Sequence, residues 1–348
     1  MTAPMPLLAV EALTKHFPSG TRDKPVRALD GVTFTVRRGE TFGLVGESGC
    51  GKSTCARTII RLYQPTDGRI RLDGTDITSL SQRQLRPFRR RMQMIFQDPY
   101  ASLNARMTVR DIVAEPLAVH ESALPKAEVT ERVELALSQV GLSREHLLRY
   151  AHEFSGGQRQ RIGIARALIL HPELILCDEP ISALDVSIQA QIVNLLRQLQ
   201  EDLDLTYVFI AHDLSMVRYM ADRVGVMYLG QLVEVADAPA LYSHPLHPYT
   251  QGLLASVPVP DPAADLVARP PAIEGDVPSP IDPPSGCRFR TRCPLARPIC
   301  GEASPALTDT GDGHEVACHL YGGPGQSPDH PSTTTTSDHQ NHLGGNPT

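Results

Sequence analysis

The sequence predicts an α/β fold with a mostly parallel sheet, and three observations predict it. The apolar run Thr41–Val45 leads into a glycine-rich loop, Gly46–Thr54, which continues into a helix-compatible segment. A later apolar run, Leu174–Glu179, ends in two carboxylates, and the run Thr206–His212 ends in a histidine. Since the carboxyl ends of parallel strands meet at one edge of an open sheet, these polar groups are expected to surround one ligand site.

The length and composition of the chain limit the classes of protein to which it can belong. With 348 residues it is long enough for about two domains. Charged residues make up 21% and the formal net charge is −6, so we expect no nucleic-acid partner, which would favour a basic surface. No uninterrupted apolar run reaches the length of about eighteen residues that a membrane span needs. The first residues lack a basic region, so no secretory signal is expected.

The glycine-rich loop has the form G-x-x-x-x-G-K-[ST], which is typical of phosphate-binding loops. Its glycines allow successive backbone N–H groups to point at phosphate oxygens. Lys52 can reach the β- and γ-phosphates, Ser53 is placed to hold Mg²⁺, and the helix that opens at about Gly51 adds its positive end. We therefore predict nucleotide binding by Gly46, Glu47, Ser48, Gly49, Cys50, Gly51, Lys52, Ser53 and Thr54.

Two strands are predicted before the loop, over Leu7–Leu13 and Gly31–Val36, with the polar segment Ser19–Pro25 between them. Phe17 follows the first strand. Its ring could stack on adenine, and a half-buried loop aromatic is an equally good interpretation of its position.

After the loop we predict a helix over Lys52–Leu62 and strands over Arg69–Leu72 and Met92–Phe96. The basic run Arg86–Arg91 is interpreted as a solvated connection. Gln97 follows the last of these strands. A glutamine there is usually an ordinary loop residue, but at the carboxyl edge of an α/β sheet its amide could reach Mg²⁺ or an attacking water.

From Val109 to Tyr150 the hydrophobic period becomes helical. One face of this pattern carries Val129, Val133, Leu137 and Val140. Next, Phe154–Gln158 opens a helix over Arg159–Leu170. Ser155 is its predicted N-cap, and the two glycines that follow leave helix N–H groups open to an anion.

The run Leu174–Glu179 has the form of a Walker B segment, in which Asp178 supports Mg²⁺ and Glu179 polarises water. Two acids after a strand are commonly solvated, but downstream of a phosphate loop the functional interpretation is favoured. An amphipathic helix is predicted over Ser187–Leu203. The next strand ends at His212; a single histidine is usually structural, but this one lies where a γ-phosphate would be bound.

The composition changes after Tyr242. His244–Thr250 leads into a predicted short helix, Gln251–Ser256. Pro258–Pro284 is rich in Pro, Ala and Asp and is predicted to be an extended linker. The low-complexity end, Gly322–Thr348, is predicted to be disordered.

Four of the seven cysteines lie together near the end of the chain: Cys287, Cys293, Cys300 and Cys318. Their spacings, C-x5-C, C-x6-C and C-x17-C, differ from the tight C-x2-C pairs of structural zinc sites. From spacing alone, a metal site and four unrelated thiols are equally good interpretations. Because a cytosolic protein that uses ATP keeps its thiols reduced, the clustering favours metal over disulfides.

Six motifs, in order, resemble those of ATP-binding-cassette (ABC) ATPases: Gly46–Thr54, Gln97, Phe154–Gln158, Leu174–Glu179, Ser182–Asp185 and His212. The one departure is Phe154, where leucine is most usual. Two further segments, Phe96–Asn104 and His247–Thr250, are similar to the ATPase subunits of bacterial dipeptide and oligopeptide importers. The resemblance covers about Leu7–Leu320.

This resemblance implies the fold of an ABC-type P-loop NTPase with an antiparallel β subdomain and a helical subdomain. The nucleotide-binding domain would span residues 1–243, with the helical subdomain at about 98–165. A small C-terminal extension with the cysteines would span 244–321, and a tail would span 322–348.

The activity that the resemblance implies is ATP hydrolysis that energises uptake of dipeptides or oligopeptides, with nickel or another small solute as the alternative. The implied partners are a second ATPase subunit (a copy or a paralogue), two membrane permease subunits and an extracytoplasmic binding protein. The chain would lie peripherally on the cytoplasmic face of the cell membrane.

The resemblance also implies roles for single residues. Phe17 would stack on adenine, Glu179 would be the general base and His212 would contact the γ-phosphate. Gln97 and the helical segment after it would carry the closure of the ATPase pair to the permeases. Mg²⁺ would be held by Ser53, Gln97 and Asp178. The partner's side of each ATP site would be formed by Ser155, Gly156, Gly157, Gln158 and Asp185.

Some members of the family carry a [4Fe–4S] cluster in the corresponding region, so the four clustered cysteines are expected to hold one. Zinc is the alternative, with His314 or His319 as a replacement ligand. Other classes of ABC ATPase fit less well. A DNA- or ribosome-associated ATPase would show a basic face, long coiled-coil insertions or tandem cassettes, and the C-terminal extension disfavours exporters and metal or sugar importers. Glu179 and His212 disfavour a non-hydrolysing subunit.

Overall fold

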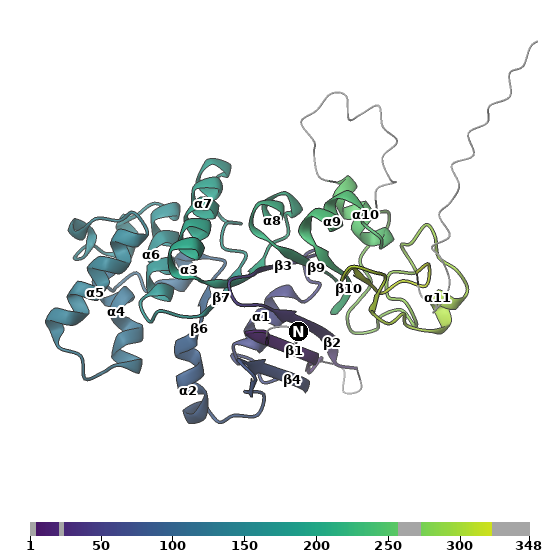
Figure 1. Ribbon diagram of the computed structural model, residues 1–348, viewed down its shortest axis with the longest axis horizontal. Helices are drawn as coiled ribbons and strands as arrows, with labels where there is room; N and C mark the ends of the chain where they lie inside the picture. Colours follow the sequence, from purple (N-terminus) through teal and green to yellow (C-terminus); the bar gives the residue numbers. More distant parts are fainter. Residues whose placement is uncertain (1–4, 21–23, 257–272, 322–348) are drawn as a thin grey trace, which may run out of the picture.

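The computed structural model describes residues 5–20, 24–256 and 273–321, and an eight-stranded sheet crosses the centre of this part of the chain (Figure 1). Its strands are β3 (Thr41–Val45), β6 (Met92–Ile95), β7 (Leu174–Asp178), β8 (Thr206–Ile210), β9 (Arg223–Tyr228), β10 (Gln231–Asp237), β11 (Thr308–Asp309) and β12 (Glu315–Val316). They lie in the order β11-β12-β10-β9-β3-β8-β7-β6. The five from β9 to β6 pair in parallel, whereas β10, β12 and β11 pair antiparallel. The predicted α/β class is confirmed.

The parallel strands explain why their sequences are continuous apolar runs. Every residue of β3, β7 and β8 is buried, as expected for strands covered on both faces. Their parallel pairing also brings the carboxyl ends of β3, β8, β7 and β6 to the same edge. The segments that follow these four strands therefore meet at one place, as the sequence predicted.

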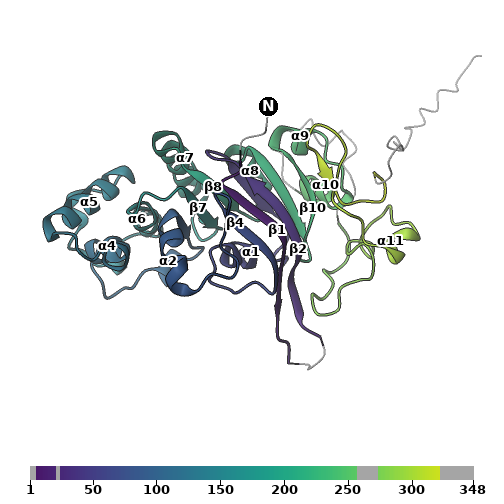
Figure 2. The same cartoon turned by 60° about the horizontal axis from the view of Figure 1, so that its bottom comes forward.

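A second, antiparallel sheet is formed by β1 (Leu8–Phe17), β2 (Val26–Val36), β4 (Asp67–Leu72) and β5 (Thr75–Asp76), in the order β2-β1-β4-β5. Figures 1 and 2 show helix α1 (Lys52–Ile59) between the two sheets. The strand β2 begins at Val26, earlier than the predicted start at Gly31. The reason is a bulge: the register jumps between the pairs Leu13–Val32 and Thr14–Asp30, and Gly31, at φ +84°, absorbs the extra residue.

The remaining helices are α2 (Gln82–Arg91), α3 (Pro99–Ser102), α4 (Val109–His120), α5 (Lys126–Gln139), α6 (Gly156–Leu168), α7 (Val186–Leu203), α8 (Leu214–Met220), α9 (Ala238–Ser243), α10 (Pro248–Ala255) and α11 (Ile299–Glu302). Short 3₁₀ turns occupy Arg144–His146 and Ala151–Glu153. Helices α3 to α6 pack on one another at one end of the molecule (Figure 1). This is the predicted helical subdomain, and Val133, Leu137 and Val140 of its predicted apolar face are fully buried.

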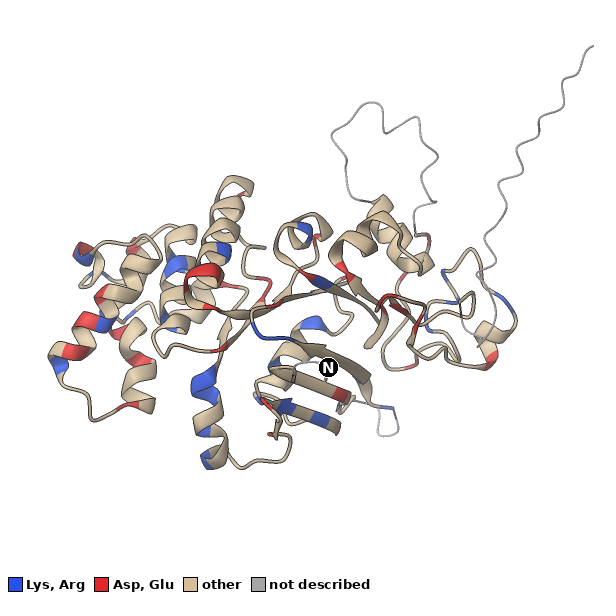
Figure 3. Ribbon diagram, viewed as in Figure 1, with Lys and Arg blue, Asp and Glu red and all other residues tan. Residues whose placement is uncertain are grey.

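The interpretation of Arg86–Arg91 as a solvated connection is wrong, because these residues form the second half of α2. Ser81 caps this helix, with a reciprocal hydrogen bond to Gln84. The basic residues appear as blue bands on α2 in Figure 3. Arg91 is half-buried, and its guanidinium pairs with Glu173 and with Asp73, at 2.9 Å from each. Arg86 and Arg90 are exposed, so part of the run is solvated as predicted, but the run is a helix and not a connection.

The C-terminal residues 273–321 pack onto the core. Strand β12 pairs with β10 at Glu234–Val235, and Phe289 is buried at 2% exposure. The Glu234 carboxylate accepts hydrogen bonds from the backbone N–H groups of Leu246 and His247 and from His314 Nε2, at 2.7, 2.9 and 2.7 Å. Much of the predicted linker, up to residue 272, and the predicted tail 322–348 lie outside the described residues. Among the helices that are described, none combines the length and apolar character needed to cross a membrane.

Candidate functional site

The phosphate loop joins β3 to α1 in a conformation that needs glycine at two points. Gly46 has φ +150°, and a Cβ there would lie 2.2 Å from the carbonyl oxygen of Met227. Gly51, the N-cap of α1, has φ +109°, and a Cβ would lie 2.3 Å from the carbonyl oxygen of Ala28. The loop is therefore pressed between β9 and β2, and only glycine permits this approach.

Lys52 lies at the start of α1 with its side chain folded over the loop. Lys52 is 4% exposed, and its Nζ donates to the carbonyl oxygens of Gly46 at 2.7 Å and Glu47 at 3.0 Å. The Cys50 sulfur lies 3.8 Å from the same nitrogen. The ammonium group is thus held at the concave side of the loop, as expected for a lysine that binds phosphate.

Asp178 ends β7 and is fully buried. Its Oδ2 accepts a hydrogen bond from Arg57 Nη2 on α1 at 3.2 Å, whereas its Oδ1 is buried with no hydrogen-bond partner. A buried carboxylate oxygen without a partner is costly unless a cation or a water meets it. This donor chemistry fits Mg²⁺, which prefers oxygen ligands. Ser53, on the first turn of α1, is half-buried and supplies a hydroxyl on the same helix as Arg57.

Glu179 follows Asp178 with φ +47°, in the left-handed region, and its side chain is 15% exposed. Gln97, which follows β6, donates from Nε2 to Glu179 Oε2 at 2.7 Å. His212, which follows β8, has its Nδ1 3.9 Å from the same oxygen and is 60% exposed. The structure thus brings these three predicted residues together from three strand ends, around one carboxylate that can accept a proton.

The segment Phe154–Gln158 is built as predicted around the start of α6. Ser155 Oγ accepts from the Gln158 N–H at 3.4 Å, and Gln158 Oε1 accepts from the Ser155 N–H at 3.1 Å. Gly157 has to lack a side chain, because a Cβ would lie 2.6 Å from Ile188 on α7. Ser155, Gln158 and Asp185, which precedes α7, are exposed on the surface. No hydrogen bond within the described chain joins this helix start to the phosphate loop.

Phe17 ends β1 and is half-buried. Its ring packs edge-on against Tyr63, with centroids 5.4 Å apart, and Lys15 Nζ lies 4.8 Å from the ring centroid. Phe17 pairs in register with Val26, close along β2 to Ala28, which touches the phosphate loop. The backbone of Phe17 thus pairs with the strand that lies against the phosphate loop.

The four clustered cysteines, Cys287, Cys293, Cys300 and Cys318, are free thiols and line one cavity of about 10 Å³ together with His247 and His319. This space holds about one water molecule, so a [4Fe–4S] cluster would require the segment to open. Burial raises the pKa of three of them, that of Cys318 to about 12. Within the described residues, no three His, Cys, Asp or Glu side chains are arranged as a metal-ion site. The other candidate ligand, His314, is hydrogen-bonded to Glu234.

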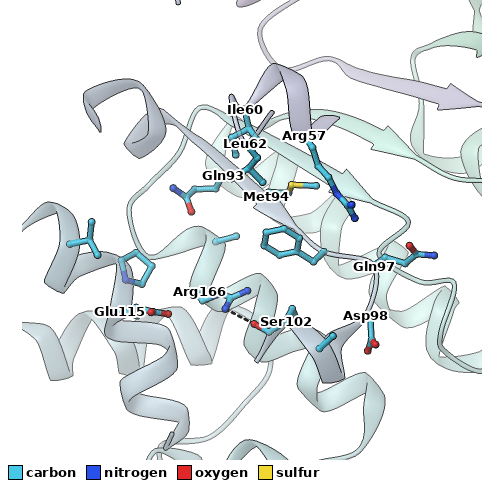
Figure 4. Close-up of a pocket in the computed structure, with 15 residues that line it drawn as sticks. Arg57, Ile60, Leu62, Gln93, Met94, Gln97, Asp98, Ser102, Glu115 and Arg166 are labelled. Atoms are coloured by element: carbon cyan, nitrogen blue, oxygen red, sulfur yellow. Dashed lines mark hydrogen bonds between the residues drawn. The ribbon is translucent and has the colours of Figure 1, made fainter. Parts of the chain in front are cut away.

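A groove of about 640 Å³ lies between the sheet and the helical subdomain (Figure 4). Ile60, Leu62 and Met94 line one side, and Glu115 and Arg166 line the other. Gln97 is also part of its lining, so the groove connects directly to the Glu179 cluster.

Sequence reasoning missed three residues that shape the site. Arg57 pairs with Asp178. Tyr249 and Arg292 contact the phosphate loop from the C-terminal segment, a name used for α10 together with residues 273–321. The sequence carries no local signal for any of them, because each acts through a contact with a residue far away in the chain.

The two sheets, the helical subdomain, the phosphate loop and the paired strand-end carboxylates define an ATP-binding cassette. A family model described as "ABC transporter" matches residues 29–182, and one described as "Oligopeptide/dipeptide transporter, C-terminal region" matches residues 233–300.

Individual proteins give the same result. The chain is 56% identical over 317 residues to the putative oligopeptide transport ATP-binding protein YkfD of Bacillus subtilis, covering 91% of this chain and 96% of that protein. It is 54% identical over 321 residues to the oligopeptide transport ATP-binding protein AppF of the same organism, covering 90% and 97%. Among solved structures, it is similar to a dimeric post-hydrolysis state of the ATP-binding cassette MJ0796 bound to ADP and Pi, at 29% identity and a TM-score of 0.61, covering 66% of this chain and 98% of that one. The chain belongs to the ABC transporter ATP-binding proteins of the oligopeptide/dipeptide transporter family.

Proposed function

We propose that this chain is the ATP-hydrolysing subunit that energises uptake of dipeptides or oligopeptides through a membrane permease complex. The observation that carries the proposal is the gathering of Lys52, Asp178, Glu179 and Gln97 at one sheet edge in a chain whose C-terminal region matches the peptide-transporter family.

ATP would be bound by residues 46–54, with Phe17 against adenine and Lys52 at the β- and γ-phosphates. The unpartnered Oδ1 of Asp178, together with Ser53 and Gln97, would hold Mg²⁺. When bound, this ion supplies charge that offsets the phosphate oxygens. Arg57 already pairs with the other oxygen of Asp178, so the carboxylate is held in one orientation.

Glu179 would take the proton of the water that attacks the γ-phosphate. The hydrogen bond from Gln97 orients its carboxylate, and His212, near the same oxygen, would contact the γ-phosphate. Because Glu179 and Gln97 follow adjacent strands, β7 and β6, a movement of the segment after Gln97 is transmitted to the general base.

A second ATPase subunit, a copy or a paralogue, would complete each ATP site in a head-to-tail pair. The support is that Ser155, Gln158 and Asp185 are exposed, capped and available to a neighbouring subunit. Ser155, Gly156, Gly157 and Gln158 would then face the γ-phosphate of the partner's ATP.

The groove beside Gln97 would receive a short cytoplasmic helix of a permease subunit. Its exposed apolar residues, Leu62 and Val119, are each 52% exposed, and a helix face of matching character would cover them. Two permeases and an extracytoplasmic peptide-binding protein would complete the transporter, which places this chain peripherally on the cytoplasmic face of the cell membrane.

The test is transport in proteoliposomes that contain the complete complex. We expect ATP-dependent uptake of a labelled peptide, stimulated ATPase activity and loss of both in Lys52→Ala. The alternative cargo is tested in the same vesicles, because uptake of nickel in place of peptide would replace the peptide assignment. A lone chain with full ATPase activity that neither permeases nor binding protein alter would refute the transport function.

We further propose that the four clustered cysteines hold a [4Fe–4S] cluster with a structural role, with zinc as the alternative. The support is that all four line the same cavity, which would have to widen from about 10 Å³ to hold the cluster, and that four thiols are a complete cluster ligand set. Since burial keeps the pKa values of Cys287, Cys293 and Cys318 high, metal binding would have to release protons. Anaerobically purified protein should be brown, with iron and acid-labile sulfide that Cys293→Ser removes. Colourless protein with one zinc per chain would replace the cluster by zinc, and protein without metal would refute both.

A further inference from the structure

The C-terminal segment holds Glu47, a residue of the phosphate loop, at two points. The Arg292 guanidinium meets the Glu47 carboxylate with both ends: Nη1 donates to Oε2 at 2.7 Å and Nη2 donates to Oε1 at 3.0 Å. The hydroxyl of Tyr249, on α10, accepts a hydrogen bond from the Glu47 backbone N–H at 2.9 Å. Arg292 and Glu47 are 245 residues apart in the chain, so this contact exists only in the folded protein.

The two side chains that contact Glu47 are buried, whereas the Glu47 side chain itself is 26% exposed. The Arg292 side chain is 6% exposed. Tyr249 is fully buried, and its ring lies 4.7 Å from Tyr228 and 5.3 Å from Phe289, centroid to centroid. A two-point guanidinium–carboxylate contact is strong and directional, and more so away from water. The position of Glu47 is therefore set by buried side chains of the C-terminal segment as well as by the loop itself.

Glu47 is also a hydrogen-bond partner of Lys52. Its carbonyl oxygen accepts from Lys52 Nζ at 3.0 Å and from the Cys50 N–H at 3.3 Å. One residue thus offers its carboxylate to Arg292, its N–H to Tyr249 and its carbonyl to Lys52. A displacement of Glu47 has to move the carbonyl that orients the Lys52 ammonium.

We propose that Arg292 and Tyr249 are positioning residues of the phosphate loop, through which the C-terminal segment sets the affinity of this chain for ATP. This rests on the proposed function only in that the loop binds ATP. Because Glu179 and Gln97 follow other strands, loss of either contact weakens ATP binding and raises KM, with a much smaller effect on kcat.

The test is titration of the purified full-length chain with MgATP by calorimetry. For Arg292→Gln we expect Kd to rise about tenfold, equivalent to about 1.4 kcal/mol. Tyr249→Phe, which keeps the ring and removes the acceptor oxygen, should raise Kd by a smaller factor. The matched control is Arg290→Gln, since Arg290 Nε donates to the Ser285 carbonyl oxygen at 2.9 Å within the same segment; its Kd should equal that of the wild type. Folded Arg292→Gln and Tyr249→Phe with wild-type Kd would overturn the proposal.

A double-mutant cycle separates positioning from general support of the fold. If Arg292 acts through Glu47, the pair Glu47→Gln and Arg292→Gln should bind no more weakly than the worse single variant. Effects on Kd that add in the double variant would contradict the mechanism, as would a lowered Tm with unchanged Kd. If Arg292→Gln does not fold, Tyr249→Phe decides the question. If Lys52→Ala loses MgATP binding while both positioning variants bind like the wild type, only this inference is removed and the proposed function stands. If the wild-type protein itself fails to bind MgATP, both are refuted.

Discussion

Replacing Glu179 by glutamine is the sharpest test of the proposed chemistry. The substitution preserves the size of a side chain that is only 15% exposed, and the new amide oxygen can still accept the hydrogen bond from Gln97 that is now 2.7 Å long. Replacing the charged carboxylate acceptor of that bond by a neutral amide costs about 1 kcal/mol, which corresponds to about a fivefold loss of turnover. Loss of the proton acceptor costs far more, about 10²–10⁴ in turnover. The two explanations thus differ by at least an order of magnitude.

The assay is ATP turnover of the reconstituted complex, with MgATP affinity measured in parallel. We expect turnover to fall by about 10²–10⁴ while ATP still binds and the ATP-bound pair accumulates. The matched control is Glu201→Gln, at an exposed position on α7, which should turn over like the wild type. A loss of less than about tenfold in Glu179→Gln would be explained by the weakened hydrogen bond alone, and Glu179 would not be the base.

Three further predictions concern binding and stability. Burial lowers the pKa of His247 to about 4. The unfolded chain therefore binds this proton at a higher pH than the folded chain, and about 3 kcal/mol of stability is lost as pH falls from about 6.5 to about 4. His247→Asn should make Tm depend less on pH over this range, and an unchanged slope would contradict the assignment. Leu62→Asp should abolish co-purification with the permeases while MgATP affinity is kept, and retained co-purification would remove the groove as docking site. Arg91 and then Arg38 lower the pKa of the Glu173 carboxyl, so its stabilisation is present above the usual glutamate pKa of about 4.3 and is lost as pH falls through the lowered one. Glu173→Gln should therefore be less stable than wild type at pH 7, with the difference shrinking in acid, and denaturant titrations that show a constant difference would exclude the ion pairs as its cause.

The sheet and the residues at its edge could be predicted because their signals are local. An apolar run that ends at a polar residue is the same pattern at Asp178, Gln97 and His212, and parallel pairing brings these run ends together with the phosphate loop at one site. The capped start of α6 could also be predicted from the sequence, since Ser155 and Gln158 interact within one helical turn.

What could not be predicted depends on contacts between distant residues. The composition of Arg86–Arg91 indicates a solvated segment, but the charge of Arg91 is paired with Glu173 and Asp73, which lie elsewhere in the chain. Gly31 looks like a strand breaker, yet it forms a bulge that lets β2 continue. Neither the partner of a charge nor the register of a strand is encoded by periodicity.

The pairing of β12 with β10 also decides where the central sheet stops. Strand β10 is buried from Leu232 to Ala236, and an unpaired backbone on such a strand is a template onto which other chains add. Here β12 occupies that position over only two residues, Glu315–Val316, and β11 beyond it is equally short. Strands of this length offer little backbone to a further chain, so the last part of the sequence limits the growth of a sheet that began with the first part.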